Sequence, residues 1–595
     1  MIDRPSAIRP TSSRRRTGHV IVCGLRGVGL RIVEQLHQSE TMVVVIDDED
    51  EPRAAAALDT WGIPLVDRGT SIASALHEAG LARASAVICV EVNELHALES
   101  ALMVRELRPD IRLVVQMANP SVAAALGGVA GDSTVLDVAT LAGPTFVEAC
   151  LRQNSHTITL AETRFDVTEA TVESNGTFRE TFGDLAPVAI MSDEQPLLAC
   201  PGRDQPLKRG DRVAVLGTSD ELSAAGLGTA RDPSAPRNRV SPWIRLARRT
   251  ATLLEERNRA LTIVIAGLVA LIVVATIVVR LCFVLPEGQG HLGILTSAYF
   301  VVETVATVGY GDFSFAAQSP WMIVFAIALI ILGVAIVSTA FALFTNILVT
   351  SRIERSLGRS EVTGMTDHIV VIGLGAVGIS VVRGLVLEGQ RVVVIERDER
   401  NRYLDQARAL GVPIVIADAT QSQTHHMVHL GDATAVAVLT SADLTNIETG
   451  LAIRETLGDR WEDVPVALRV FDRELARLME RNFGFRHVRS TSAIASPWFV
   501  GAALGLDVIS TFYVDHEPFL VGKVAISPDG GLVGLAMKEL SSRTRVIALV
   551  RAGTQGDLEH PPRRGTRFAT GDEAYLLGPY EEILWVLQRN HEGAR

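Results

Sequence analysis

Two long apolar runs near the middle of the chain limit what it can fold into. Residues 261–285 contain one charged side chain, Arg280 near the end of the run, and residues 321–350 contain none. At about 1.5 Å per residue, each run is long enough as a helix to cross the roughly 30 Å hydrocarbon layer of a bilayer. Core helices of soluble proteins are shorter and amphipathic. We therefore predict two spans of a lipid bilayer, and the second is long enough to tilt or to extend beyond it.

The charges that flank the two runs predict their orientation. Arginines precede the first run and follow the second, whereas residues 286–320 contain no Lys or Arg. Positively charged loops tend to stay in the cytoplasm. We therefore expect both termini in the cytoplasm, residues 286–320 outside, and the protein in the plasma membrane. The flanking arginines are Arg245, Arg248, Arg249, Arg257, Arg259, Arg352, Arg355 and Arg359.

The composition of the chain limits which partners it can bind. The formal net charge is -12, whereas nucleic-acid binding needs a basic surface that neutralises phosphates, so we expect no nucleic-acid partner. The five cysteines form no C-x-x-C pair, which predicts reduced thiols and no disulfide framework. Residues 1–17 lack the apolar core of a signal peptide, and we expect them to form a disordered basic tail.

The segment between the spans is too apolar for an ordinary linker. Residues 291–306 are largely apolar and run into the sequence T-V-G-Y-G-D at 307–312. Irregular backbone at membrane depth is tolerated only where protein surrounds it or where it lines a cavity. We therefore predict a re-entrant pore loop over 291–314. Its first part, from about 295 to 304, should be a short helix whose C-terminal partial negative charge points at a cation.

Residues 303–312, placed between two spans, resemble the pore of a two-transmembrane potassium channel. In that family four such loops line up rings of oxygen atoms that replace the hydration shell of K+. Gly309 and Gly311 permit positive φ angles, so that successive carbonyls can point to one side. Because one chain supplies one loop, the resemblance implies a homotetramer that conducts K+ passively.

The resemblance also assigns roles to single residues. The implied selectivity filter is Thr307, Val308, Gly309, Tyr310 and Gly311, with K+ held at the first four of them. From their position alone, we expect Glu303 and Asp312, which flank the filter, to support it by sharing a proton or a water behind it. Gly333 lies near the middle of the second span, where a glycine is either a gating hinge or a site of close helix packing.

The sequence on either side of the spans is a duplication. Residues 19–29 read HVIVCGLRGVG and residues 368–378 read HIVVIGLGAVG. The same spacing of 349 positions links Asp47 to Glu396. Such a repeat indicates one domain used twice, with the two spans inserted between the copies.

Each copy begins like a Rossmann fold, with an apolar strand, a glycine turn, an apolar helix, and a second strand that ends in an acid. In the second copy Gly373, Gly375 and Gly378 form a G-x-G-x-x-G motif. This motif supplies the tight turn, the close backbone approach and the helix packing that a pyrophosphate needs. Glu396 is expected to accept hydrogen bonds from ribose hydroxyls. The pattern favours nucleotide binding, and a purely structural Rossmann lobe remains the alternative.

The second copy resembles an RCK (TrkA-type) regulatory domain, the cytosolic module that gates many potassium channels and transporters. The resemblance rests on the glycine motif, on Glu396, and on the sequences ADAT at 417–420 and TSADLTN at 440–446. The residues that in such families surround the nucleotide or hold its cleft are Asp418, Thr420, Asp443 and Asn446. The implied regulatory ligand is NAD(H) or an adenine nucleotide, and Ca2+ is a second candidate.

The first copy departs from this pattern. It retains weaker candidate ligands at Gly24, Gly27, Gly29 and Asp47, but Arg26 replaces the middle glycine. An arginine there blocks the close approach of a pyrophosphate, although its guanidinium can pair with a phosphate instead. We predict a degenerate or differently liganded site. The acidic run that follows, 47–51, is expected to be a solvated turn, with Ca2+ binding as the alternative.

Two histidines raise the question of a metal site. His425 and His429 lie four residues apart on a predicted helix, a spacing that metal ligands can use. No third acidic or cysteine ligand is in register. A packed or solvated helix face is therefore the favoured interpretation.

Each Rossmann lobe precedes a shorter β-rich stretch that resembles the C-terminal subdomain (TrkA-C) of RCK proteins. The predicted fold class is mixed: an α-helical two-span pore with a re-entrant loop, flanked by two α/β Rossmann-like RCK domains, each with a small α+β subdomain. The predicted order is a basic tail (1–17), a first Rossmann lobe (18–155) and its subdomain (156–228), a linker (229–260), the pore (261–350), a linker (351–366), and a second lobe (367–500) with its subdomain (501–595).

These patterns predict a ligand-gated potassium channel in which ligand binding changes the angle between lobes and pulls on the second span. Two alternatives remain. A regulatory component of a potassium transporter would not need its own filter at 307–311. A membrane-anchored NAD-dependent oxidoreductase would need a catalytic set of side chains, and since none stands out we expect no enzymatic activity.

Overall fold

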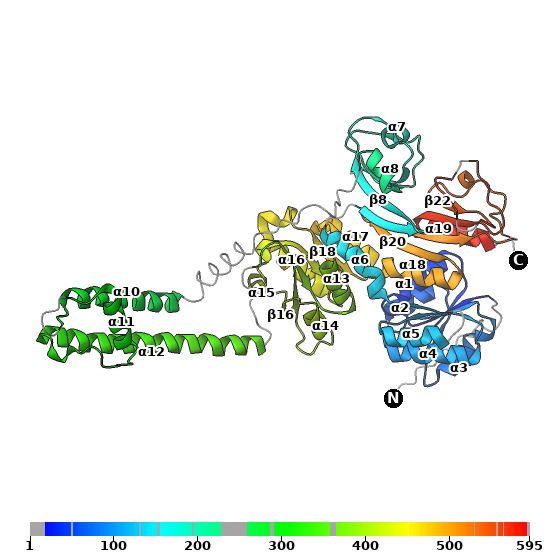
Figure 1. The fold of residues 1–595 in the computed structure, drawn as a ribbon. Coiled ribbons are helices and arrows are strands. Elements are labelled where there is room, and N and C mark those ends of the chain that lie inside the picture. Colours follow the sequence, from blue (N-terminus) through cyan, green and yellow to red (C-terminus); the bar gives the residue numbers. More distant parts are fainter. Residues whose placement is uncertain are drawn as a thin grey trace. The chain divides into compact units, whose positions relative to one another are not determined.

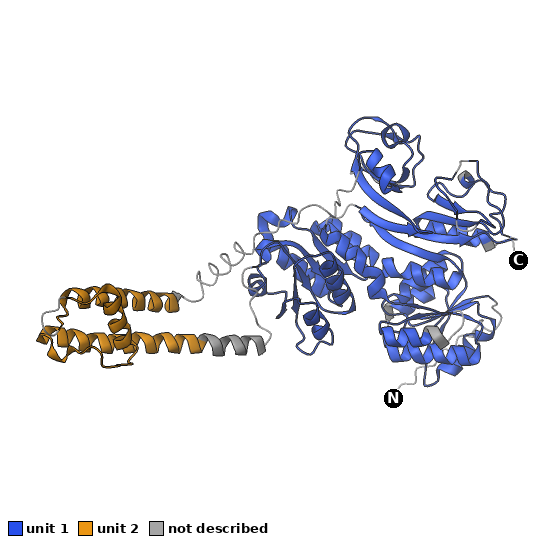
Figure 2. Ribbon diagram, in the orientation of Figure 1, with its two compact units in different colours: residues 1–231, 365–595 blue, residues 232–364 orange. Residues whose placement is uncertain are grey.

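The computed structural model describes residues 18–48, 52–129, 133–151, 155–192, 195–227, 259–285, 291–356, 365–528, 530–554, 557–562 and 565–591. The chain divides into two compact units (Figure 2). The larger comprises residues 1–231 and 365–595, and the smaller residues 232–364. The predicted tail, most of the two predicted linkers and the arginines from Arg245 to Arg257 lie outside the described residues.

Each half of the larger unit begins with a six-stranded parallel sheet, in the orders β3-β2-β1-β4-β5-β6 and β16-β15-β14-β17-β18-β19. This is the Rossmann order, which confirms the predicted fold class. The first sheet consists of β1 (Val20–Cys23), β2 (Val43–Asp47), β3 (Leu65–Asp67), β4 (Ala86–Cys89), β5 (Arg112–Gln116) and β6 (Ser133–Leu136). The second consists of β14 (His368–Ile372), β15 (Val392–Glu396), β16 (Ile414–Ile416), β17 (Ala433–Val438), β18 (Val466–Val470) and β19 (His487–Ser490).

Helices connect the strands and cover both faces of each sheet, which is why the central strands are continuous apolar runs. In the first half they are α1 (Gly29–Gln38), α2 (Pro52–Trp61), α3 (Ile72–Glu78), α4 (Glu94–Leu107) and α5 (Pro120–Val129). In the second half they are α13 (Ala376–Leu387), α14 (Leu404–Ala409), α15 (Ser422–Met427), α16 (Asp443–Leu457) and α17 (Arg473–Phe483).

The last helix of each Rossmann lobe packs on the other lobe (Figure 1). Helix α6 (Val138–Leu151) lies against α13 and the second sheet, and α18 (Thr491–Leu504) lies against α1 and the first sheet. Both helices are apolar on nearly all sides, so they need burial all round. A Cβ on Gly143 of α6 would lie 2.5 Å from Ser380 Oγ of α13, so the two helices are in close contact there. The lobes therefore share their hydrophobic cores.

A small antiparallel sheet follows each lobe, with the orders β11-β10-β13-β8-β7 and β20-β21-β24-β22-β23. One core joins the two sheets and includes Phe165, Phe512 and Phe519. The strands are β7 (Ser155–Leu160), β8 (Thr163–Thr171), β10 (Ala186–Ser192), β11 (Gln195–Ala199), β13 (Arg212–Thr218), β20 (Asp507–Val514), β21 (Glu517–Ala525), β22 (Arg545–Val550), β23 (Leu558–Glu559) and β24 (Glu573–Pro579). Short helices α7 (Phe178–Phe182) and α8 (Ser219–Ala224), and the longer α19 (Tyr580–His591), complete the predicted α+β subdomains.

The smaller unit contains the two long apolar helices, α10 (Arg259–Cys282) and α12 (Pro320–Ser356), with α11 (Ile294–Val305) between them. The parts of α10 and α12 that are long and apolar enough to cross a membrane are Ala260–Cys282 and Pro320–Asn346. Aromatic rings gather around Phe300 of α11, which lies 5.5 Å from Phe283 and 4.7 Å from Phe315 between ring centroids. These contacts hold the loop after α11 against the end of α10.

Candidate functional site

The loop after α11 has the backbone that the sequence predicted. Gly309 and Gly311 have φ angles of 61° and 88°, and Thr307 has a φ of 57°. No atom lies within 4 Å of a Cβ added to either glycine. Glycine is therefore needed there because of the left-handed backbone conformation, not because space is short. Positive φ is uncommon at a residue with a side chain. The loop is therefore held in a specific, irregular conformation.

Glu303 on α11 holds this loop. Its Oε1 accepts a hydrogen bond from the backbone nitrogen of Tyr310. Its Oε2 is buried and has no hydrogen-bond partner among the described residues. Asp312 has a different partner, because its Oδ2 accepts from the hydroxyl of Tyr299 at 3.1 Å. Both acids thus brace the loop against α11, each through its own contact.

Gly333 lies where α12 crosses the end of α11. A Cβ at this position would lie 3.2 Å from Val305 Cγ1 and 3.3 Å from Val305 Cα. Helix α12 continues without interruption from Pro320 to Ser356. The contact supports close packing as one reason for the glycine, and the gating hinge stays a prediction.

The three motif glycines of the second lobe occupy three different environments. A Cβ on Gly373 would lie 2.9 Å from Thr440 N, and one on Gly378 would lie 2.1 Å from Gly373 O. A Cβ on Gly375 would meet nothing within 4 Å. The outer glycines therefore permit the tight turn and the close helix contact, whereas the middle one faces open space beside the N-terminus of α13. A phosphate can approach the backbone there.

Acidic side chains lie at or just after the C-terminal ends of the neighbouring strands β15 and β16. Glu396 Oε2 accepts from Leu374 N at 2.7 Å, and its Oε1 accepts from the backbone nitrogens of Arg397 and Asp398. Asp418 Oδ1 accepts from the backbone nitrogen and the hydroxyl of Thr420, and these bonds lower the pKa of Asp418. Both carboxylates are held in place by these hydrogen bonds and can accept from a sugar hydroxyl.

Asn446 and Asp443 make hydrogen bonds beside the glycine loop. The buried Asn446 amide accepts from Thr440 N at 3.0 Å and donates to Thr440 O at 3.0 Å and to Arg469 O at 2.9 Å. Asp443 accepts from Phe471 N at 3.2 Å, and burial raises the pKa of its carboxyl. Asn446 therefore ties β17 to β18, which fits the cleft-holding role that the resemblance implies.

A cavity of about 670 Å3 lies over the glycine loop. Glu396, Asp418 and Arg469 line it. Residues of the first lobe close it from the other side, namely Gly27, Val28, Val92, Glu94, Gln116, Ala118, Asp137, Val138 and Ala139. Arg469 was not predicted from the sequence, although a single arginine within the apolar strand V-A-L-R-V was a signal that could have found it.

The first lobe keeps the same backbone frame. Asp47 Oδ2 accepts from Leu25 N at 2.8 Å, as Glu396 does from Leu374 N. Cβ atoms on Gly24 and Gly29 would lie 2.7 Å from Glu91 N and 2.1 Å from Gly24 O. Gly27 has a φ of 61° and faces open space. The frame is therefore that of a Rossmann cleft, and the acidic residues 49–51 lie outside the described part of the chain.

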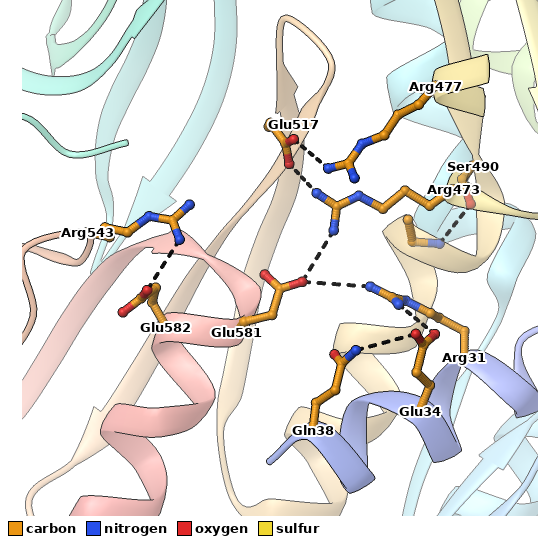
Figure 3. Close-up of polar contacts among 11 residues, drawn as sticks. Arg31, Glu34, Gln38, Arg473, Arg477, Ser490, Glu517, Arg543, Glu581 and Glu582 are labelled. Atoms are coloured by element: carbon orange, nitrogen blue, oxygen red, sulfur yellow. Dashed lines mark hydrogen bonds and ion pairs between the residues drawn. The ribbon is translucent and has the colours of Figure 1, made fainter. Parts of the chain in front are cut away.

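Arg26 lines a separate cavity of about 740 Å3, which residues of the second lobe close. An ion-pair cluster forms part of this cavity wall (Figure 3). Glu581 of α19 lies 3.3 Å from Arg473 Nη1 of α17 and 3.7 Å from Arg31 Nη2 of α1. Arg473 and Arg477 both pair with Glu517 of β21. The cluster thus connects both Rossmann lobes to the second C-terminal subdomain.

The two predicted helical histidines do not share a helix face. Helix α15 ends at Met427, and His429 lies beyond it with a φ of 48°. His425 is buried, with Nε2 2.8 Å from Ala419 O and Nδ1 2.7 Å from Thr456 Oγ1. The described residues contain no group of three or more His, Cys, Asp or Glu side chains that could hold a metal ion. The helix prediction was wrong at its end, and His425 is a packed residue.

Known families match both units of the chain. The TrkA-N domain model matches residues 20–136 and 369–491, and the ion channel model matches residues 263–350. The crystal structure of the GsuK RCK domain aligns with a TM-score of 0.50 at 15% identity, covering 100% of this chain and 98% of that one. At this identity the alignment shows a common fold alone.

Two curated relatives are potassium channels. The voltage-gated potassium channel Kch of Escherichia coli (strain K12) is 25% identical over 30% of this chain and 42% of its own length. The calcium-gated potassium channel TvoK of Thermoplasma volcanium is 23% identical over 47% of this chain and 81% of its own length. The chain spans less than half the length of two of the curated relatives that it matches. The chain therefore contains two TrkA-N domains, one on each side of an ion channel domain.

Proposed function

We propose that this protein is a ligand-gated potassium channel whose filter is residues 307–311. The observation that carries the proposal is the irregular loop between two spans, with positive φ at Thr307, Gly309 and Gly311 and a brace from Glu303 to Tyr310. Carbonyl groups on such a loop can replace the hydration shell of K+.

The channel is proposed to be a homotetramer, since one chain supplies one loop and a ring of oxygens needs several. Exposed apolar surface supports this. Tyr310 is 71% exposed in the single chain, and only 17% and 22% of the apolar windows of the two spans is buried. Surface of this kind needs neighbouring chains or lipid to cover it. The flanking arginines support a plasma-membrane orientation with both termini in the cytoplasm.

The gating ligand is proposed to be NAD(H) or an adenine nucleotide bound in the cleft of the second lobe. The open space at Gly375 and the acids Glu396 and Asp418 support this assignment. Binding there would act on the segment that joins α12 to β14, and through it on the inner end of the second span. TvoK is named as calcium-gated, which makes Ca2+ a second candidate ligand.

Ion flux into liposomes that contain only the purified protein tests the proposal. We expect uptake of K+ in preference to Na+, and we expect Gly309→Ala to reduce it at least tenfold because alanine is strained at a φ of 61°. Gly202→Ala is the matched control, since Gly202 is exposed with nothing within 4 Å of an added Cβ. Flux that Gly309→Ala leaves unchanged would refute the filter, and absence of flux from the purified protein would favour a regulatory subunit.

A further inference from the structure

We propose that the buried guanidinium of Arg469 binds the diphosphate of the ligand in the second cleft, across from the glycine loop. The inference rests on the nucleotide site of the proposed function, whose glycine motif already favours a pyrophosphate. It also assigns a ligand-binding role to a residue outside the glycine motif and the acids that follow it.

Arg469 is a buried cation with weak partners. It is the fourth of the five residues of β18, next to the C-terminal end of the strand, and is 9% exposed. Its Nη1 donates to Leu439 O and Thr440 O at 3.4 Å each, the long end of the range for hydrogen bonds. Its guanidinium carbon lies 4.6 Å from the centre of the Phe471 ring. Its Nε has no hydrogen-bond partner within the described parts of the chain.

No carboxylate among the described residues forms an ion pair with Arg469. Asp443 influences its charge from a distance, but that carboxylate accepts from Phe471 N instead. Burial lowers the pKa of Arg469 to about 10, so the side chain is still charged at neutral pH. A buried charge without a close counterion is unfavourable, and an anionic ligand would remove this cost.

The position of Arg469 fits a phosphate. It lines the same cavity as Gly373, Gly375 and Ala376. The backbone of Thr440 lies next to both the glycine loop and Arg469. A Cβ on Gly373 would lie 2.9 Å from Thr440 N, and Arg469 Nη1 lies 3.4 Å from Thr440 O. A guanidinium binds phosphate oxygens in pairs, and the N-terminus of the twelve-residue helix α13 attracts the same group.

The other residues that line the cavity indicate the orientation in which the ligand binds. Glu396 and Asp418 are acceptors that suit sugar hydroxyls and repel phosphates. The other arginines that line the cavity, Arg397 and Arg402, are exposed. The sugar therefore belongs at the ends of β15 and β16, and the diphosphate belongs between α13 and Arg469. Gln116 of the first lobe corresponds to Arg469, because each lies four residues before the next helix, α5 or α17. The first lobe therefore has no cation at the equivalent position.

Calorimetry on the full-length protein in detergent tests the inference with ADP, NAD and adenosine. We expect wild type to bind ADP at least tenfold more tightly than adenosine. Arg469→Gln should bring that ratio close to one while leaving the affinity for adenosine unchanged, and Arg469→Lys should restore part of it. Arg400→Gln removes an exposed arginine that does not line this cavity and should keep the full ratio.

Thermal unfolding separates a binding defect from a folding defect. Arg469→Gln without ligand should unfold at a temperature no lower than wild type, because a buried charge is removed, but ADP should raise its midpoint less than that of wild type. A ratio of affinities that Arg469→Gln leaves unchanged would overturn the inference alone. If wild type binds none of the three compounds, both the inference and the proposed nucleotide site fail.

Discussion

In the loop after α11, the carboxylate of Glu303 accepts a hydrogen bond from the backbone nitrogen of Tyr310. This contact ties α11 to the fourth residue of the proposed filter. Glu303 is 7% exposed, so the carboxylate end of the bond is buried. An N–H group left without a partner in such a place costs about 1 to 3 kcal/mol.

Glu303→Ala should therefore loosen the filter. We expect K+ uptake into liposomes to fall at least tenfold or to lose its preference over Na+, because Tyr310 N loses its acceptor. Glu303→Gln retains an acceptor oxygen and should keep more of the activity. Glu399→Ala, at an exposed position of the larger unit, serves as the control and should behave like wild type. Equal activity of Glu303→Ala and wild type would contradict the bracing role.

Gly375→Arg places in the second lobe the residue that the first lobe has at position 26. The side chain would fill the open space beside α13, so we expect nucleotide affinity measured by calorimetry to fall at least tenfold. The fold should remain intact, because a Cβ at Gly375 meets no atom within 4 Å. Nucleotide binding equal to that of wild type would refute the assignment of this cleft.

Gly143→Leu should weaken the packing of α6, from the first lobe, against α13 of the second lobe. An added side chain would collide with Ser380 of α13, since even a Cβ would lie 2.5 Å from its Oγ. Overpacking of this kind costs about 1 to 3 kcal/mol. We expect a lower midpoint of thermal unfolding for Gly143→Leu and little change for Gly202→Leu. A midpoint equal to that of wild type would mean that α6 and α13 are not packed as described.

Glu581→Gln should weaken the cluster that joins α1, α17 and α19. Its ion pairs with Arg31 and Arg473 are partly exposed, so the loss in free energy of unfolding should be below about 1 kcal/mol. Salt screens such pairs, and the difference from wild type should shrink as ionic strength rises. Glu106→Gln, at an exposed position of α4, is the control. A difference that salt does not change would argue against an electrostatic contribution.

His516 should make stability depend on pH. Its Nδ1 lies 2.9 Å from Glu480 Oε1, and this contact raises the pKa of His516, with Asp515 adding to the effect and Arg489 opposing it. A raised pKa in the folded state stabilises the fold fully below the unfolded value of about 6.5 and loses that contribution as pH rises through the folded value. Wild type should therefore exceed His516→Gln in unfolding midpoint at pH 5.5, and the gap should close by about pH 8 or above. A gap that is constant across this range would contradict the contact.

Local patterns in the sequence predicted the features that depend on neighbouring residues, namely helices and turns. The apolar runs predicted α10 and α12, and the glycine spacing predicted the turns at Gly309 and Gly373. The end of α15 was not predicted, because the chain leaves the helix to bury Leu430 before it enters β17.

Relationships between distant segments could not be predicted in this way. A helix that is apolar all round, such as α6, indicates burial but does not name the surface that buries it. Likewise, Arg469 lies beside the glycine loop only because strand order places β14, β17 and β18 next to one another. A single sequence does not contain that proximity as a pattern.

The current through a planar bilayer that contains the purified protein, with K+ on one side and Na+ on the other, tests the central claim most directly. We predict a reversal potential set by K+ and a current that changes when ADP or NAD is added. In Gly375→Arg the preference for K+ should remain and the response to nucleotide should be lost. No current, or a current that Na+ carries as readily as K+, would contradict the account.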